Sequence, residues 1–570
     1  MMARSDRLSA LRILVIGGYG GFGARLCRRL ATAGHHIMVG GRSIERARLF
    51  CRELPGAEPV AIDRTRDVAP ILSRHRPDLV IDAAGPFQDG GFAVPEACIR
   101  YSIPYLDLAD ATGFVTGIGR FDAAARATGV AIVSGASSAP ALTGAVARRL
   151  AEGLDRVHSV DVALSAANRA SGGDSVIAAV LSYVGRRAPL WRGGRWTHGF
   201  GWQEMRREDF LFADDSGLRG RLVALADLPD CTLLPDLLPG RPAVTFRAGS
   251  ESAFHMIALW LASWPVRWGW LRSLTGARRW LLPFYRLTSR SGRRRSAMSI
   301  TLAGSRAGQC LERRWTIVAE QGDGLEIPTL SAELLAADLL AGRLPTGAMN
   351  AAGLLSLDRY EAAFASLAVR HEIVERKLPP PLYERVLGER YHRLPAAVRA
   401  MHQVCRDAGA AGEAKVLRGK TLAARFIARL MRFPPADSWP LHVAFRERDG
   451  AESWIRDFGG HRFTSRLSQA GSLICESFGP LRFLFRIEAG ESALAMHLRS
   501  WSFLRLPLPR ALAPRIAARE WQEQGRFRFD VGVALPVVGR VIAYTGWLSP
   551  LGEQAEDQAA CAPLSAASAS

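Results

Sequence analysis

The sequence predicts an α/β fold that begins with a doubly wound parallel sheet. Over the first 140 residues, short apolar and β-branched runs alternate with stretches of helical spacing, which is typical of parallel strands joined by helices. From Trp439 onward the pattern changes to short runs in which apolar and Arg residues alternate between Asp-Gly and Gly-Gly turns, and this predicts an antiparallel sheet or small barrel. A chain of 570 residues is too long for one core.

A glycine-rich turn follows the first predicted strand, Leu11–Ile16, and precedes a helical stretch. Its glycines fit the spacing G-x-G-x-x-G, in which the first permits the tight turn, the second lets a pyrophosphate approach, and the third lets the helix pack on the strand. The free N–H groups at the helix N-terminus attract phosphate. The motif predicts a Rossmann domain that holds a dinucleotide with Gly18, Tyr19, Gly20, Gly21, Phe22 and Gly23.

The second predicted strand, His36–Val39, ends in Gly40-Gly41-Arg42-Ser43. NAD enzymes usually carry an acidic residue here for the ribose 2′-hydroxyl, and such a residue would repel a 2′-phosphate. Arg42 is able to bind the phosphate bidentately and Ser43 to add a hydrogen bond, so the sequence favours NADP over NAD. The alternative is that Arg42 is only a solvated loop residue.

Further cofactor contacts are expected where the later strands end. Asp63 ends the third predicted strand, Glu58–Asp63, near the expected adenine position. The fourth strand runs into the loop of Ala84, Gly85, Pro86 and Phe87, whose small residues let the nicotinamide half of the cofactor pass over the sheet.

Several of these motifs resemble saccharopine dehydrogenase-like oxidoreductases. They are GGYGGFG, GRS, AAGPF, YLDLAD and the Gly135–Pro140 loop, where Ser137 is expected to touch the cofactor. Gly172–Ser175 resembles the family's Gly-Gly-Thr turn, with Asp in place of Thr. The resemblance covers residues 10–375 and implies a Rossmann domain, an inserted sheet-rich domain, and a closing helical segment for which Leu330–Gly342 and Gly347–Leu357 are suited. Family members oxidise or reduce C=N, C=O or C=C bonds, including lipid enoyl groups. No amino-acid substrate signature is present, which argues against saccharopine itself.

Four regions are therefore expected. They are a Rossmann domain at 10–140, an α+β substrate or dimerisation domain with the helical return at 141–375, a C-terminal domain at 382–550, and a disordered Ala/Ser-rich tail at 551–570. A proline-rich break at Lys377–Pro381 separates the second region from the third. The C-terminal region resembles an uncharacterised bacterial domain often fused to such oxidoreductases.

Candidate proton donors cluster at the end of the strand that begins at Tyr105. They are Tyr105 itself, Asp107 and Asp110, and burial of a carboxyl there would raise its pKa. The alternative is that Asp107 and Asp110 cap a helix or bind backbone amides. No cluster of metal-ligand spacing is present, so no metal is expected.

Trp260–Arg295 is rich in Trp and Arg, and no acidic residue occurs between Glu251 and Glu312. Indole rings and guanidinium groups together suit a membrane interface, where they meet headgroups and phosphates. The stretch therefore predicts a peripheral membrane contact. The alternative is a Trp-rich helical pair packed inside the second domain or at a homodimer interface.

Charge and cysteine content limit the partners and the cellular compartment that we expect. The net charge is +20, but no nucleic-acid-binding motif accompanies it, so no nucleic-acid partner is expected. Eight scattered Cys without a C-x-x-C pair predict buried, reduced thiols and a cytoplasmic protein, at the inner membrane if the Trp/Arg stretch meets lipid. We expect an NADP-dependent oxidoreductase that acts on a carbonyl, imine or enoyl group of a small or lipid-like substrate. The alternative is a non-catalytic nucleotide sensor or a lipid- or protein-binding module.

Overall fold

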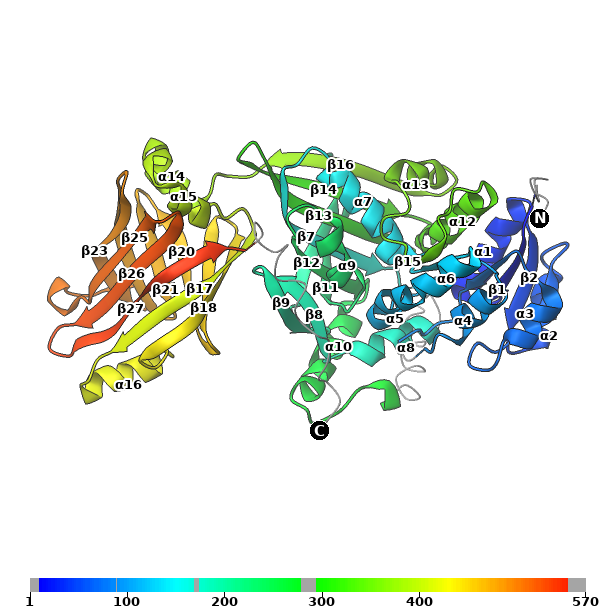
Figure 1. Ribbon diagram of the computed structural model, residues 1–570, viewed down its shortest axis with the longest axis horizontal. Helices are drawn as coiled ribbons and strands as arrows, with labels where there is room; N and C mark the ends of the chain where they lie inside the picture. The colour runs from blue at the N-terminus through cyan, green and yellow to red at the C-terminus, as the bar shows by residue number, and fades with distance from the viewer. Residues whose placement is uncertain (1–9, 89, 169–173, 278–293, 552–570) are drawn as a thin grey trace.

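The computed structural model describes residues 10–88, 90–168, 174–277 and 294–551. Three sheets follow one another along the long axis of the molecule (Figure 1): a parallel sheet at the N-terminal end, a mixed sheet in the middle, and a closed antiparallel barrel at the other end. The predicted α/β class, with an α+β second region and a C-terminal barrel, is confirmed.

The parallel sheet has the strand order β3-β2-β1-β4-β5-β6-β15. Its apolar strands are buried because helices cover both faces. The strands are β1 (Arg12–Ile16), β2 (His36–Gly41), β3 (Glu58–Ala61), β4 (Leu79–Asp82), β5 (Tyr105–Asp107), β6 (Ala131–Ser134) and β15 (Gly347–Asn350). The helices are α1 (Gly21–Thr32), α2 (Ile44–Cys51), α3 (Ala69–His75), α4 (Ala93–Arg100), α5 (Thr112–Gly117), α6 (Asp122–Thr128) and α7 (Thr143–Ala151).

The chain returns to this sheet after the middle domain. The first returning segment is helical, as expected: α12 (Ile327–Leu340) packs on α1 through ion pairs of Arg25 with Glu326 and of Arg29 Nε with Glu333 Oε2, the latter at 2.5 Å. The second returning segment differs from the expected helix, because residues 347–350 form β15, which pairs in parallel with β6 and extends the sheet.

The middle sheet has the order β10-β11-β12-β7-β13-β14-β16, and only β12 and β7 pair in parallel. Its strands and those of the separate hairpin β8–β9 are β7 (Arg156–Ala166), β8 (Arg187–Arg192), β9 (Arg195–Phe200), β10 (Arg206–Leu211), β11 (Gly217–Leu225), β12 (Ala243–Ser250), β13 (Ser296–Arg306), β14 (Gln309–Ala319) and β16 (Val369–Lys377). The accompanying helices are α8 (Asp174–Tyr183), α9 (Asp230–Leu237), α10 (Ala253–Arg267) and α13 (Leu357–Phe364).

The C-terminal barrel is an antiparallel meander closed by pairing of its first strand, β17, with its last, β27. Alternate residues face an aromatic interior, which explains the period of two in the sequence. The strands are β17 (Asp407–Arg418), β18 (Asp437–Arg448), β19 (Ala451–Phe458), β20 (His461–Ala470), β21 (Leu473–Phe478), β22 (Leu481–Ala489), β23 (Ala493–Phe503), β24 (Leu506–Pro507), β25 (Arg515–Glu523), β26 (Arg526–Leu535) and β27 (Gly539–Pro550). The helices are α14 (Leu382–Leu387), α15 (Ala396–His402) and α16 (Leu422–Leu430).

The barrel docks tightly against the β8–β9 hairpin. A Cβ added to Gly409 would lie 1.9 Å from the carbonyl oxygen of Gly193, so only glycine fits at this contact. The N–H of Gly193 donates to Asp407 Oδ1 at 2.6 Å, and Arg195 forms an ion pair with Asp457 at 2.7 Å.

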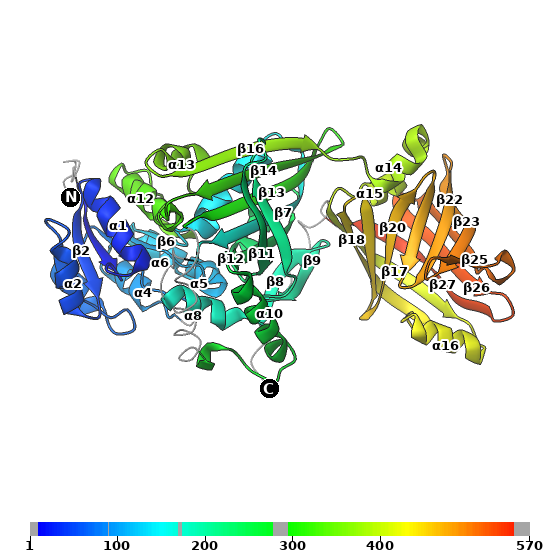
Figure 2. The same ribbon diagram turned by 180° about the vertical axis from the view of Figure 1, so that it is seen from behind.

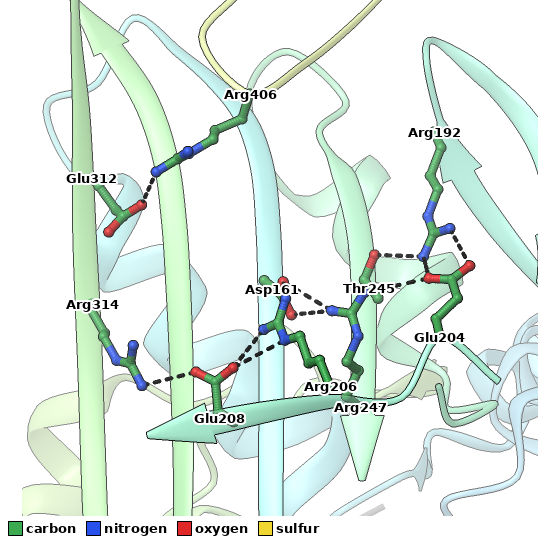
Figure 3. A network of polar contacts seen from close by, with 10 residues as sticks. All are labelled: Asp161, Arg192, Glu204, Arg206, Glu208, Thr245, Arg247, Glu312, Arg314 and Arg406. Carbon is green, nitrogen blue, oxygen red and sulfur yellow. Dashed lines mark hydrogen bonds and ion pairs between the residues drawn. The ribbon is translucent and has the colours of Figure 1, made fainter. Parts of the chain in front are cut away.

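A network of ion pairs crosses the face of the middle sheet (Figure 3). In its central part, Arg247 Nη1 lies 2.7 Å from Asp161 Oδ1. A separate pair on the same sheet reaches the barrel side, where the largely buried Glu312 accepts from Arg406 at 2.8 Å. A buried charge such as that of Glu312 is stable only when it is paired. The pair therefore fixes the side chains of Glu312 and Arg406 and the position of the barrel.

Two cysteines depart from the expected reduced state. Cys310 on β14 and Cys405 before β17 form a disulfide, with a Cα–Cα distance of 5.9 Å. They are 95 residues apart in sequence, so their spacing gave no signal of the pairing. Five other cysteines among the described residues are free thiols, as expected.

We predict that Arg406→Ala destabilises the docked barrel, because it removes one of the two arginines that neutralise Glu312 and the partner of Glu447. The expected loss is roughly 1–3 kcal/mol, measured as a lower midpoint of thermal unfolding and faster proteolysis in the linker at 378–381. Arg466→Ala, which changes an exposed arginine on β20, is the matched control. Equal midpoints for the two variants would contradict the role of the network.

Candidate functional site

The predicted nucleotide turn lies at the carboxyl end of β1, where open α/β sheets place their ligands. Gly17 adopts a φ of +78°, and the N–H groups of Gly17 and Gly18 both donate to the carbonyl of Gly40, at 2.8 and 3.0 Å. The turn is therefore attached to the end of β2, and α1 begins directly after it at Gly21.

Two glycines of the motif are required by close packing. A Cβ on Gly23 would lie 2.1 Å from the carbonyl oxygen of Gly17, and a Cβ on Gly18 would lie 2.9 Å from that of Val15. A Cβ on Gly20 would meet only one atom within 4 Å, the Gly17 oxygen at 3.0 Å. Gly18 and Gly23 thus shape the turn, whereas the side of Gly20 is open to an approaching group.

The start of α1 has the properties of a phosphate cradle. Its first turn carries no acidic residue, and Gly20 occupies the N-cap position, so no capping side chain covers the free N–H groups there. Nearby, the Tyr19 side chain packs against Gly41 at the end of β2, away from this helix start. The residues present therefore fit the pyrophosphate of a dinucleotide.

The end of β2 is organised around Tyr19. Its hydroxyl accepts from the N–H of Ser43 at 3.0 Å, and the guanidinium carbon of Arg46 lies 4.8 Å from the ring centroid. The Ser43 hydroxyl caps α2, where it accepts from Arg46 N at 3.2 Å and donates to Glu45 at 3.0 Å. The Ser43 hydroxyl is thus used as a helix cap, whereas it was expected to bind phosphate. Arg46 is a second cation in this region, which the sequence did not reveal.

Arg42 is exposed beside this group. The N–H and hydroxyl of Thr65 bond to Asp63 and lower its pKa, with further contributions from Arg42 and Arg66. The structure therefore places Arg42 and Asp63 near one another, with the Arg42 side chain open to solvent.

An ion pair that the sequence analysis missed lies beside the loop after β4. Arg64 Nε donates to the fully buried Asp82 at 2.9 Å, and its guanidinium carbon lies 4.4 Å from the centroid of the Phe87 ring. Asp82 also accepts from the N–H of Ala84 at 2.9 Å. Burial raises the pKa of Asp82 and Arg64 opposes that rise. Arg64 thus holds in place the loop of Ala84, Gly85, Pro86 and Phe87.

Asp107 is fully buried. Its Oδ1 accepts three hydrogen bonds, from Gly135 N at 2.8 Å, Ala109 N at 2.9 Å and Ser134 Oγ at 3.0 Å. Its Oδ2 has no hydrogen-bond partner among the described residues, and burial raises the pKa of Asp107 to about 6. This arrangement favours the alternative interpretation, in which Asp107 binds backbone amides and positions the loop after β6.

Tyr105 is equally buried, within the core between the sheet and α4. Burial raises the pKa of its hydroxyl well above the usual value. The structure therefore places Tyr105 away from the open edge at which a substrate would meet the cofactor.

Asp110 lies between the two domains and only part of its surface is covered. Gln88 Nε2 donates to its Oδ1 at 3.2 Å, and burial raises the pKa of the carboxyl. The pKa of Asp227, from the middle domain, is also raised by burial although Thr112 donates to it at 2.8 Å. Burial raises the pKa of Tyr183 on α8, and the charges of both carboxylates raise it further. Asp227 and Tyr183 were missed because they follow Asp110 by more than 70 residues.

An apolar cavity of about 160 Å³ lies beside the cofactor loops. Phe22 of the glycine turn and Ser138 of the loop after β6 border it on one side, and the middle sheet supplies side chains such as Met298 and Ile317. The neighbouring Ser137 is held by α12, since Ser331 Oγ donates to its carbonyl at 2.9 Å. Ser331 in turn lies 2.7 Å from the hydroxyl of Tyr360.

Within the described ranges, no group of His, Cys, Asp and Glu could hold a metal ion, and no helix is long and apolar enough to cross a membrane. Residues 278–293 of the Trp/Arg stretch, the Gly172-Gly173 turn and residues 552–570 of the tail lie outside these ranges.

Two family descriptions match parts of the chain. Residues 13–100 match the NAD dependent epimerase/dehydratase family, and residues 394–548 match a domain of unknown function, DUF4166. The second match confirms the uncharacterised C-terminal domain expected from the sequence. No curated protein matches the chain.

Solved dehydrogenase structures are similar to about two thirds of the chain. Saccharopine dehydrogenase (L-Glu forming) from Saccharomyces cerevisiae is 12% identical over 64% of this chain and all of its own, with a TM-score of 0.45. Amine dehydrogenase from Mycobacterium smegmatis is 12% identical over 61% of this chain and 96% of its own, with a TM-score of 0.32. GenD2 of gentamicin A biosynthesis, in complex with NAD, is 14% identical over 66% of this chain and 99% of its own, with a TM-score of 0.32.

We predict that Asp107→Asn alters the pH dependence of stability while the fold persists. The pKa of an aspartate is near 3.9 in an unfolded chain and about 6 here, so the folded state binds the proton more tightly. The stabilising contribution of this proton is complete below pH ~4, falls as pH rises to about 6, and is lost above that, by roughly 3 kcal/mol at most.

Urea unfolding of both proteins from pH ~4 to ~8 checks this. The stability of the wild type relative to Asp107→Asn should fall across that window, because asparagine mimics the protonated acid and does not titrate. Asp63→Asn is the control: hydrogen bonds lower the pKa of Asp63, so its loss should change stability with the opposite sign. Parallel profiles for the wild type and Asp107→Asn would refute the assignment.

Proposed function

We propose that the protein is an NADP-dependent oxidoreductase that transfers a hydride to or from a carbonyl, imine or enoyl group of an apolar, lipid-like substrate. The observation that carries the proposal is the cavity between Phe22 and Ser138, because it joins both cofactor loops to an apolar wall. A reacting group held there would lie beside a cofactor seated on the glycine turn.

The choice of NADP is supported by charge at the end of β2. Arg42 and Arg46 flank the region next to Tyr19, and β2 ends in Gly40-Gly41 where NAD enzymes place an acid. A 2′-phosphate gains charge-assisted hydrogen bonds from such arginines. Two acids lie in this region: the Glu45 carboxylate accepts from the Ser43 hydroxyl, and Asp63 lies near Arg42.

The preference for an apolar substrate follows from the cavity wall. The side chains that line it include Leu142, Leu164, Met298 and Ile317, with few polar atoms. Apolar walls bind alkyl chains through burial and give little affinity to a charged amino acid. The nicotinamide, when bound, supplies the hydride, and the chain's own residues orient the substrate and exclude water.

We take Asp110 and Asp227 as the candidates for holding a proton. Burial raises the pKa of both carboxyls, so each keeps its proton to a higher pH than an exposed carboxyl would. Both lie where the Rossmann domain meets the middle domain, whereas Asp107 and Tyr105 are sealed within the core. We therefore assign proton delivery to the Asp110 group and loop positioning to Asp107.

We predict that NADPH binds more tightly than NADH, measured by the change in protein fluorescence during titration. Arg42→Ala should weaken NADPH by about tenfold to a hundredfold, since one charge-assisted contact is worth ~1.5–3 kcal/mol, and should leave NADH unchanged. Arg52→Ala, which changes another exposed arginine after α2, is the matched control and should alter neither. Equal affinity for both nucleotides in the wild type would overturn the choice of NADP.

We also predict NADPH oxidation with long-chain enones or aldehydes and none with amino-acid-derived keto acids. Val176→Asp places a charge at the cavity and should lower kcat/KM for the apolar substrate by about tenfold or more, with NADPH binding unchanged. Val374→Asp is the matched control, because Val374 lies on β16 and has the same 37% exposure. NADPH binding without turnover of any carbonyl, imine or enoyl compound would favour the nucleotide-sensor alternative.

A further inference from the structure

Helix α16 on the barrel has its apolar side facing outward. The side chains that it buries against the barrel are two alanines, Ala424 and Ala428. The three large apolar residues Leu422, Phe426 and Leu430 are 83%, 69% and 71% exposed. They are spaced four residues apart, so they form one stripe along the helix. A surface helix normally packs its large apolar residues inward, and α16 does the reverse.

The surroundings of this stripe are apolar and basic. Val537, at the tip of the β26–β27 turn, is fully exposed, and the next residue, Val538, accepts from Thr421 at the N-cap of α16 at 3.2 Å. Between Glu413 and Asp437 the chain has no acidic residue, while it has six basic ones: Lys415, Arg418, Lys420, Arg425, Arg429 and Arg432.

Helix α10 and the turn after it form a second exposed apolar surface. Ile257 and Leu261 on the helix, then Trp268, Trp270 and Leu271 after it, are all exposed, and Trp270 is 73% exposed. The alternative in which the Trp/Arg stretch is packed inside the second domain therefore fails for these residues. No acidic residue occurs in the sequence between Glu251 and Glu312, and Arg267 and Arg272 are exposed here, so the described part of this surface is also basic.

The two surfaces lie on the same side of the molecule. In Figure 1 and in Figure 2, which shows the opposite side, α10 and α16 both project along the lower edge, α10 from the middle domain and α16 from the barrel. Because the barrel is docked on the middle domain by the contacts of Gly409, Asp457 and Arg406, both helices are able to meet one flat partner together.

We propose that α10 and α16 form a two-point docking face for a bilayer of anionic phospholipids. Exposed Trp, Phe and Leu side chains enter the interfacial region, and the flanking arginines pair with lipid phosphates. The proposal does not depend on the oxidoreductase activity.

Charge favours this occupant over a second copy of the chain. In a twofold dimer the same face meets itself, so the basic residues around α16 would oppose one another without an acidic partner between Glu413 and Asp437. An anionic lipid surface neutralises both helices at once. Each contact then brings the other within reach of the membrane, and the paired affinity exceeds that of either helix.

The test is sedimentation of the full-length protein with vesicles of phosphatidylcholine alone or mixed with phosphatidylglycerol. We expect binding to the mixed vesicles, at least tenfold weaker binding to neutral ones, and weakening by high salt. Phe426→Glu and Trp270→Glu should each reduce binding about tenfold or more, and the double variant should abolish it. Leu49→Glu is the matched control, because Leu49 is an exposed leucine on α2 at the far end of the molecule.

All substituted positions are exposed, so thermal unfolding midpoints should stay at the wild-type value and confirm that the variants fold. Equal binding by wild type, Phe426→Glu and Trp270→Glu would overturn the proposal, as would equal binding to neutral and mixed vesicles. A dimer by light scattering without vesicles, converted to monomer by Phe426→Glu, would overturn it in favour of self-association.

Discussion

The close approach of α1 to the turn before it determines much of the site. Because Gly23 has no Cβ, α1 lies so close to the turn that a Cβ added to Gly23 would be 2.1 Å from the Gly17 carbonyl oxygen. This close approach sets the direction of α1. Arg25 and Arg29 on α1 then meet α12, and Ser331 on α12 holds the carbonyl of Ser137. The two loops that border the cavity are thus linked through a helix that comes more than 300 residues after the turn. A shift of α1 would therefore move both the phosphate cradle and the wall of the cavity.

Local features were predictable from the sequence, and long-range ones were not. The glycine turn, the strands β1 to β6 and the alternating pattern of the barrel follow from neighbouring residues, and the structure contains them. Arg64 with Asp82, and Asp110 with Asp227, are brought together by chain crossings that no local pattern reveals. The resemblance implied a helix where β15 lies, and the strand was missed because its four residues acquire extended structure only by pairing with β6. Ser43 was expected to bind phosphate, but helix α2 begins one residue later and uses its hydroxyl as a cap.

Two buried carboxylates lie under the edge that would bind the cofactor, and each orders a different loop. Asp82 faces Arg64 and keeps the Ala84–Phe87 loop in place, whereas Asp107 has only neutral donors and holds Gly135. The ion pair with Arg64 neutralises the charge of Asp82. Asp107 has three hydrogen bonds instead, and burial raises its pKa, which favours the neutral acid. Both carboxylates accept hydrogen bonds from the backbone and so order the loops next to the cofactor. Because a buried carboxylate with this structural role also has a raised pKa, a raised pKa here does not by itself identify a proton donor.

The rigid attachment of the barrel gives the two exposed helices their combined effect. If the barrel moved freely, binding of α10 to a surface would not bring α16 to the same surface. The binding of each helix would then cost its own conformational entropy. The Gly409–Gly193 contact and the Arg406–Glu312 pair remove that freedom in advance. On the middle domain, Leu181 of α8 belongs to the same buried cluster as Met256 and Val266 of α10, and Val176 of α8 borders the apolar cavity. A surface that meets α10 therefore lies against the same domain that supplies the wall of the cavity.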